Sequence, residues 1–291
     1  MSTERMLRVG LVQMAMSPDA DDNLHKAISM AERAAAIGAQ VICLPELFTT
    51  LYFPMREDAE GLADKAGLLN IIPGRVTEAL GELARSTGTV IVGGSLFEAT
   101  EDGNFNTATV YENDGRCLGK YRKTHIPDDE GFFEQHYFKP GDTGFQVFQT
   151  SVGRLSALIC YDQWFPEAAR SVALMGAELV FYPTAIGTVK GIGQAEGDWQ
   201  QAWENVMRGH AIANAMPVCA VNRVGTEGET EFYGGSFVCD AFGKTLARGG
   251  KGEEVVIADI DMDHGPKVRE GWRFFHNRRP ECYGQLVRKK D

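Results

Sequence analysis

Three residues of reactive type each follow a predicted strand of this sequence, and together they could perform nucleophilic catalysis. Cys160 follows LSALI, Glu46 follows VICLP and Lys123 follows CLGKYR. A carboxylate within hydrogen-bonding reach can take the proton of a thiol, which is nucleophilic only once it is ionised. A fixed ammonium can stabilise the oxyanion that forms when the thiolate attacks a carbonyl or nitrile carbon. Taken singly, Cys160 could be an inert core thiol, Glu46 a helix-capping acid and Lys123 a solvated charge.

The segment 153–170, GRLSALICYDQWFPEAAR, predicts the corner on which the thiol would lie. Its apolar run predicts a buried strand, and Tyr161-Asp162-Gln163 predicts a polar turn. Pro166 with Glu167 is typical of a helix start. A thiol at such a corner would have backbone N–H groups nearby that can face an oxyanion. From this segment alone, a buried structural cysteine is an equally good interpretation.

Composition and charge exclude several other classes of protein. The 291 residues are 44% hydrophobic and 24% charged, which is ordinary for a globular protein. The net charge of −11, without a basic stripe, argues against a nucleic-acid partner. The N-terminus does not resemble a signal peptide and no segment approaches the roughly 20 apolar residues that span a bilayer, so we expect no membrane association. Six scattered cysteines without a C-x-x-C pattern indicate a reduced, cytoplasmic protein.

A recurring order of strands and helices predicts an α/β fold with two related halves. We expect strands at 9–14, 41–45, 90–96, 107–112 and 117–122 in the first half, with helices at 23–36, capped by Asp21 or Asp22, and at 76–85. We expect strands at 145–149, 154–160, 179–183, 218–224, 232–240 and 244–248 in the second half, helices at 164–175 and 198–214, and a closing strand at 255–260. No linker separates the halves, which favours one domain over residues 1–291. Because neighbouring parallel strands end at one sheet edge, Glu46, Lys123 and Cys160 are expected to converge there.

Three ordered blocks of this sequence resemble the signature blocks of the nitrilase superfamily, also called the carbon–nitrogen hydrolases. The blocks are LPELF at 44–48, KYRKTHIP at 120–127 and CYDQWFPEAAR at 160–170. The resemblance extends to NRRPECY at 277–283 and so covers nearly the whole chain. It implies a four-layer αββα sandwich with two pseudo-symmetric halves. It also implies a homodimer or higher homo-oligomer, in which the C-terminal tail, about 262–291, could pack on a partner subunit.

The same resemblance implies a catalytic triad of Glu46, Lys123 and Cys160 that needs no cofactor and no metal. Many members of the family carry a second active-site glutamate after the lysine block. Glu134 in GFFEQHYF occupies the matching place, and Glu130 is the nearby alternative.

The resemblance also suggests a mechanism, which is here a hypothesis. Glu46 would take the proton of Cys160, and the thiolate would attack the carbonyl carbon of the substrate. Lys123 and the backbone N–H of Tyr161 would hold the oxyanion.

Within the family, the sequence around Cys160 resembles N-carbamoylputrescine amidases more than true nitrilases or aliphatic amidases. The runs DQWFPEAARSVALMGAELVFYPTAIG, HYFKPGDTGFQVFQT and FYGGSF carry this resemblance. It implies hydrolysis of a carbamoyl C–N bond in a small substrate that carries an amine tail. Tyr52 and Trp164 are expected to contact that substrate. Glu196, or its neighbour Asp198, could pair with the ammonium of the tail, although a solvated loop acid is the simpler interpretation.

Several other functions are also compatible with parts of this sequence. A related enzyme could act on another N-carbamoyl compound, an omega-amide or a nitrile, and a non-catalytic interaction module would not need all three triad groups. An arginine in the loop 188–200 would favour a carboxylate-bearing substrate, but the only cation there is Lys190. The run Gly191–Gly197 narrowly misses G-x-G-x-x-G, and we interpret it as a loop. Neither a G-x-S-x-G elbow nor an H-E-x-x-H pair occurs in the sequence.

Overall fold

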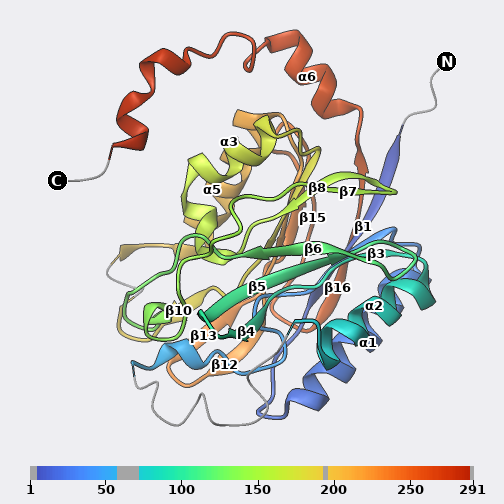
Figure 1. Cartoon of the computed structure of the whole chain (residues 1–291), viewed down its shortest axis with the longest axis vertical. Coiled ribbons are helices and arrows are strands. Elements are labelled where there is room, and N and C mark those ends of the chain that lie inside the picture. Colours follow the sequence, from blue (N-terminus) through green and yellow to red (C-terminus); the bar gives the residue numbers. More distant parts are fainter. Residues whose placement is uncertain (1–4, 58–71, 193–195, 289–291) are drawn as a thin grey trace.

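Two mixed β-sheets pack face to face and each is covered on its outer side by two helices (Figure 1). The computed structural model describes residues 5–57, 72–192 and 196–288. The first sheet has the strand order β16-β1-β2-β3-β5-β4, with β6 beside β5. The second has the order β15-β14-β11-β9-β8-β7. This arrangement is the expected αββα sandwich.

The elements of the first sheet and its helices come from the first half of the chain, with one strand from near the C-terminus. They are β1 (Met6–Gln13), α1 (Ala20–Ala36), β2 (Val41–Cys43), α2 (Arg75–Thr87), β3 (Val90–Val92), β4 (Leu96–Thr100), β5 (Gly103–Tyr111), β6 (Cys117–Arg122) and β16 (Glu254–Asp261). Strand β16 is the expected closing strand, and it pairs antiparallel with β1.

The second sheet and its helices come from the second half. They are β7 (Phe148–Thr150), β8 (Gly153–Ala157), α3 (Pro166–Leu174), β9 (Leu179–Pro183), α5 (Trp199–Asn214), β11 (Val218–Val221), β14 (Phe237–Cys239) and β15 (Thr245–Arg248). A small third sheet holds β10 (Gly187–Val189), β13 (Thr230–Tyr233) and β12 (Val224–Glu227). The remaining elements are α6 (His264–Trp272) and the short 3₁₀ helices η1 (Phe53–Met55), η2 (Glu134–His136), η3 (Cys160–Trp164), η4 (Pro280–Cys282) and η5 (Gly284–Val287).

The two halves repeat one topology, as the sequence predicts. Strands β1, β2 and β3 are mutually parallel and are joined through α1 and α2. Strands β8, β9 and β11 are likewise parallel, and α3 and α5 lie in their connections. Because parallel strands all end at the same edge, each half places its strand-end residues at one edge of its sheet.

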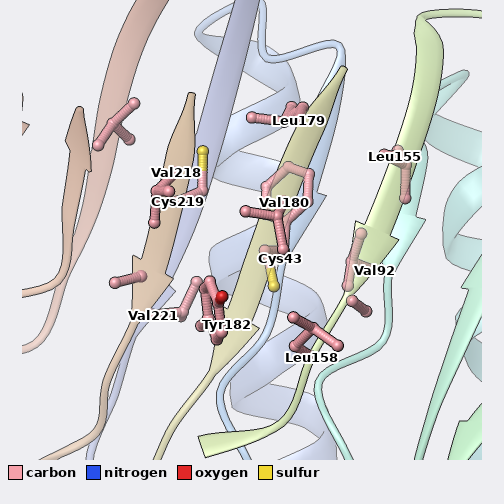
Figure 2. Packing of buried hydrophobic residues seen from close by; sticks show 14 of the residues in the cluster. Cys43, Val92, Leu155, Leu158, Leu179, Val180, Tyr182, Val218, Cys219 and Val221 are labelled. Carbon is pink, nitrogen blue, oxygen red and sulfur yellow. The ribbon is translucent and has the colours of Figure 1, made fainter. Parts of the chain in front are cut away.

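The core between the sheets explains why these strands are almost wholly apolar. Along β2, Val41 and Cys43 belong to the cluster that includes the second sheet, whereas Ile42 packs with the helices of the first half. Figure 2 shows Cys43 and Val92 of the first sheet in the same cluster as Leu155 and Cys219 of the second. A strand buried on both faces loses the alternation of polar and apolar residues, which is why these runs read as continuous apolar stretches.

Several expected boundaries are wrong, and a helix cap or a glycine turn explains some of them. Helix α1 begins at Ala20 because Asp19, and not Asp21 or Asp22, is its cap and accepts the backbone N–H groups of both. The strand expected at 90–96 is two strands, β3 and β4. Gly94 turns the chain between them with φ of 62°, where a Cβ would lie 2.2 Å from the Pro45 carbonyl oxygen. The strands expected at 218–224 and 232–240 are likewise divided, the second of them at the glycine pair Gly234-Gly235.

Helix α6 and the segment after it run along the outside of the molecule (Figure 1). Several large apolar side chains there are exposed, among them Trp272 at 60%, Leu286 at 64% and Val287 at 85%. Among the described residues, no helix is both long and apolar enough to cross a membrane.

Candidate active site

The ends of four segments bring together the residues that the sequence singles out. Glu46 follows β2, Lys123 follows β6, Glu134 begins η2 and Cys160 begins η3. All four side chains are buried. The residues meet, but not at one sheet edge as expected: Glu46 and Lys123 follow strands of the first sheet, whereas Cys160 follows β8 of the second.

Lys123 forms the centre of a buried charge cluster. Its Nζ lies 2.8 Å from Glu46 Oε1, and 2.7 and 2.8 Å from the two carboxylate oxygens of Glu134. Burial alone would lower the pKa of Lys123, but the two carboxylates outweigh it and raise that pKa above its usual value. The lysine is therefore a permanent ammonium, as oxyanion stabilisation requires.

Tyr52 and Asn106 add hydrogen bonds to the two glutamates, although Glu46 Oε2 has no hydrogen-bond partner among the described residues. The Tyr52 hydroxyl donates to Glu134 Oε1 over 2.7 Å, and Asn106 Nδ2 donates to Glu46 Oε1 over 2.8 Å. Burial, followed by the charge of Glu134, raises the pKa of Tyr52 well above its usual value, so that the phenol remains a donor. The pKa of Glu134 is also raised, mainly by burial and secondly by Glu46, against the attraction of Lys123.

Cys160 occupies the sharp corner that the sequence predicts between β8 and η3. Its φ is 41°, a left-handed conformation that is unfavourable for a side chain other than glycine. The sulfur lies 4.0 Å from the carbonyl oxygen of Ala185. Burial and the negative charge of Glu46 raise the pKa of the Cys160 thiol well above its usual value, and Lys123 offsets this only in part. The resting thiol is therefore protonated, and its reaction needs a base.

Asp162 connects this corner, through hydrogen bonds, to the segment 120–127 that carries Lys123. Its carboxylate accepts the backbone N–H of Ile159 over 2.9 Å and the hydroxyl of Tyr121 over 2.7 Å. It also lies 2.7 Å from Nδ1 of His125 and accepts the backbone N–H of that residue. One buried carboxylate thus fixes the nucleophile corner relative to the segment that carries Lys123.

Arg223 holds the backbone of the segment that carries Glu46. Its fully buried guanidinium donates to the carbonyl oxygens of Glu46 over 2.7 Å and of Leu47 over 3.0 Å. Its charge is paired with Glu227 at 2.9 Å, and Glu227 accepts the backbone N–H of Tyr52. An arginine and a glutamate of the second half therefore position site residues of the first half.

The sequence reasoning missed Asn106 and Arg223, although each carries a recognisable signal. Asn106 lies inside strand β5, where asparagine is disfavoured. Arg223 lies just after β11, at the same kind of strand end that indicated the other residues.

A cavity of about 570 Å³ opens beside Cys160 and Glu134. It is lined by Pro127, Asp129, Glu130, Phe132, Glu134, Cys160, Tyr161, Gln163, Trp164, Ile186, Ile192, Glu196, Trp199 and Ala202. Apart from Glu134, its charged lining consists of Asp129, Glu130 and Glu196, which are exposed. None of these described lining residues is a lysine, arginine or histidine, so the outer part of the cavity suits a cation.

The structure places most of the predicted substrate-contacting residues in this cavity. Trp164 and Glu196 line it, and Tyr161 lines it directly after the nucleophile. Tyr52 is not part of the lining. Its hydroxyl donates to Glu134, which does line the cavity. Asp198 accepts the backbone N–H of Gln201 and so caps α5.

Two further sequence-based expectations concern this region. Glu130 lies in the cavity wall, whereas Glu134 contacts Lys123, so Glu134 is the second glutamate of the charge cluster. Part of the glycine-rich run interpreted as a loop, residues 193–195, lies outside the described residues.

Comparison with known proteins agrees with this geometry. Residues 8–270 match the sequence pattern of the family described as carbon–nitrogen hydrolase. An N-carbamoylputrescine amidase from Solanum lycopersicum is 40% identical, over 97% of this chain and 95% of its own. A citrullinase from Francisella tularensis is 37% identical, over 97% of this chain and 99% of its own.

Solved structures support the same relationship. A carbon–nitrogen hydrolase from Helicobacter pylori superposes with a TM-score of 0.91 at 37% identity, over 98% of this chain and all of its own. An amidase from Nesterenkonia superposes with a TM-score of 0.78 at 28% identity, over 99% and 98%. A mutant of a Nesterenkonia amidase carries the acetamide moiety of fluoroacetamide covalently at its active-site cysteine.

Proposed function

The chain belongs to the carbon–nitrogen hydrolase family, and from this premise we propose that it hydrolyses N-carbamoylputrescine to putrescine, carbon dioxide and ammonia through Cys160. The relatives named N-carbamoylputrescine amidase support the substrate, since they align over nearly the full length of the chain. The observation that carries the proposal is the cavity beside Cys160, whose outer charges are all negative. A ureido group at the sulfur would leave its cationic tail among these carboxylates.

The first half of the reaction forms a covalent intermediate. Glu46 takes the thiol proton, and the sulfur bonds to the carbamoyl carbon. Lys123 and the backbone N–H of Tyr161 stabilise the negative oxygen. As this tetrahedral species collapses, one C–N bond breaks, and the departing nitrogen takes the proton from Glu46. Glu134 orients Lys123, because both of its carboxylate oxygens lie within hydrogen-bonding distance of the Lys123 ammonium. We assign it also to the departing nitrogen, since it lines the cavity beside Cys160.

The second half releases the acyl group. Glu46 takes a proton from water, and the resulting hydroxide attacks the thioester-type carbonyl. The carbon–sulfur bond then breaks, and the proton returns to Cys160. The carbamic acid that leaves decomposes to carbon dioxide and the second amine, so that one water molecule is consumed for each substrate. No step uses a metal or a cofactor.

Two further properties belong to this proposal. We place the enzyme in the cytoplasm, and the six free cysteines support this, since they suit a reducing compartment. We also propose a homodimer in which the tail after α6 covers its exposed apolar side chains on the partner subunit. Light scattering should give a dimer for the full chain and a monomer after truncation at residue 276; a monomeric full chain would contradict this.

Ammonia release from matched compounds tests the function. The substrates are N-carbamoylputrescine, L-citrulline, N-carbamoyl-β-alanine, an omega-amide and an aliphatic nitrile. We expect the highest kcat/KM for N-carbamoylputrescine, because N-carbamoyl-β-alanine would bring a carboxylate toward an acidic cavity. A higher kcat/KM for citrulline would reassign the substrate within the ureido class. Absence of release from every ureido compound would overturn the proposal.

A further inference from the structure

Gln163 carries a buried hydrogen-bond donor that the fold leaves unused. The residue is fully buried and lines the cavity beside Cys160. Its Oε1 accepts from the indole N–H of Trp203 over 2.7 Å and from the Thr184 hydroxyl over 3.3 Å. Its Nε2 has no hydrogen-bond partner within the described parts of the chain. An unpaired buried donor is costly, so such a group indicates a partner that arrives from outside the fold.

The surrounding side chains fix which end of this amide is the donor. The indole N–H of Trp203 can only donate, so the group that faces it must be the oxygen of Gln163. A rotated amide would place two donors against each other. The backbone is fixed as well, since Nε2 of His210 lies 2.7 Å from the carbonyl oxygen of Gln163. Burial lowers the pKa of His210, so the ring is neutral and donates from this nitrogen.

The short helix η3 carries both Gln163 and the nucleophile. Gln163 is three residues after Cys160. Both side chains line the same cavity. A ligand whose carbon contacts the sulfur therefore occupies the cavity that Gln163 also lines.

The donor requires an acceptor, and the chemistry of the substrate identifies it. A ureido group has one good acceptor, its carbonyl oxygen, because the lone pairs of its nitrogens are delocalised. We propose that Gln163 Nε2 donates a hydrogen bond to this oxygen and that the bond strengthens as the oxyanion forms. Gln163 is thus a further catalytic residue that acts beside Lys123 and Tyr161. This inference rests on the proposed function for the identity of the substrate, but any amide substrate would present the same oxygen.

Two substitutions at Gln163 test this role against a matched surface change. Gln163→Met keeps the length and removes the donor, and we expect it to lower kcat/KM for N-carbamoylputrescine by about 10²–10³, the usual effect of losing one oxyanion donor. Gln163→Glu should lower it further, because a carboxylate would repel the oxyanion. Gln201→Met, at an exposed position of α5, should leave kcat/KM unchanged. Thermal unfolding of each variant shows that the fold persists.

Binding to a variant that cannot react separates this role from a structural one. In the Cys160→Ser background, Gln163→Met should weaken the binding of N-carbamoylputrescine. It should not weaken the binding of putrescine, which has no carbonyl oxygen. The inference would be overturned if the binding of both ligands weakened equally, or if kcat/KM of Gln163→Met stayed within about threefold of wild type. If the wild type does not cleave N-carbamoylputrescine, the proposed substrate is wrong. The same variants are then compared on whichever amide or ureido compound it does cleave.

Discussion

The inner end of the cavity and its mouth are built in different ways. At the inner end, Glu46, Lys123 and Glu134 are buried, and the lysine contacts both carboxylates at 2.7–2.8 Å. At the mouth, Glu130 and Glu196 are exposed and face a cavity without a cation in its described lining. Under the proposed function, the buried residues of the inner end perform the chemistry, whereas the exposed residues of the mouth face the tail of the substrate. Changes at the inner end should therefore act on kcat, and changes at the mouth on KM.

Cys160→Ser is the strongest test of the inner end. A hydroxyl has the same shape but ionises far less readily, and we expect kcat to fall by about 10⁴ or more. The melting temperature should remain close to that of the wild type, because the substitution preserves the side-chain volume. Ammonia release and thermal unfolding measure the two quantities. Near-normal turnover would refute the nucleophile and with it the contrast between the two ends.

Alkylation of Cys160 at different pH values tests its base. Because the pKa of the thiol is raised, simple ionisation would make the rate rise about tenfold per pH unit from about pH 7 to about 9, without a plateau. If Glu46 takes the proton internally, the wild-type rate should be nearly independent of pH over this range. Glu46→Gln should restore the steep rise and react about 10² times more slowly at pH 7.

Iodoacetamide is the reagent, in a background with the exposed cysteines replaced, Cys117→Ser and Cys282→Ser. A steep rise for the parent protein would remove the proposed role of Glu46. A Glu46→Gln variant whose alkylation rate depends on pH as in the parent protein would also contradict the role of Glu46.

The site residues that could be predicted from the sequence are positioned by strand ends, whereas those that were missed are positioned by tertiary packing. Glu46 and Cys160 follow apolar strands and Lys123 follows the second strand of a hairpin marked by Asp114-Gly115, so the ends of all three strands can be recognised from the sequence. Asn106 reaches the site only because β5 pairs with β6 in one register, in which the Lys123 N–H donates to the Asn106 carbonyl oxygen. Such registers depend on tertiary packing and cannot be read from a single sequence.

The same limit applies to the contacts between the two halves. The parallel strand order of each half follows from its alternation of strands and helices, which is visible in the sequence. The contact of Arg223 with the Glu46 segment joins residues 177 positions apart and appears only once both sheets are packed. The division of the strands expected at 90–96 and 232–240 has a local origin instead, since Gly94 and the pair Gly234-Gly235 adopt positive φ and turn the chain.

The buried pair Arg223–Glu227 tests how far the inner end depends on its support. Arg223→Met would leave Glu227 buried without its counter-charge, and we expect a loss of about 3–5 kcal/mol in the free energy of unfolding. Arg248→Met is the matched control, since it removes a partly exposed arginine that also pairs with a glutamate, Glu204, and it should cost about 0–1 kcal/mol. Urea unfolding measures both values. Equal losses would show that the buried pair does not hold the segment that carries Glu46.

The mouth should give the smallest and most selective effect. Glu196→Gln removes one exposed carboxylate from the cavity, and we expect KM for N-carbamoylputrescine to rise about two- to fivefold, the effect of a solvent-screened ion pair. Because this exposed carboxylate has no part in the proposed chemical steps, kcat should not change. Glu229→Gln is the control, since that carboxylate pairs with Lys190 and does not line the cavity.

n-Butylurea, which lacks the terminal ammonium of N-carbamoylputrescine, makes the test specific for charge. Its KM should be the same for wild type and Glu196→Gln, and the difference for N-carbamoylputrescine should shrink as salt is added, since counter-ions screen exposed charges. A fall in kcat would place Glu196 in the chemistry and contradict the division between the two ends. An equal rise in KM for n-butylurea would mean that the side chain shapes the cavity and does not recognise an ammonium.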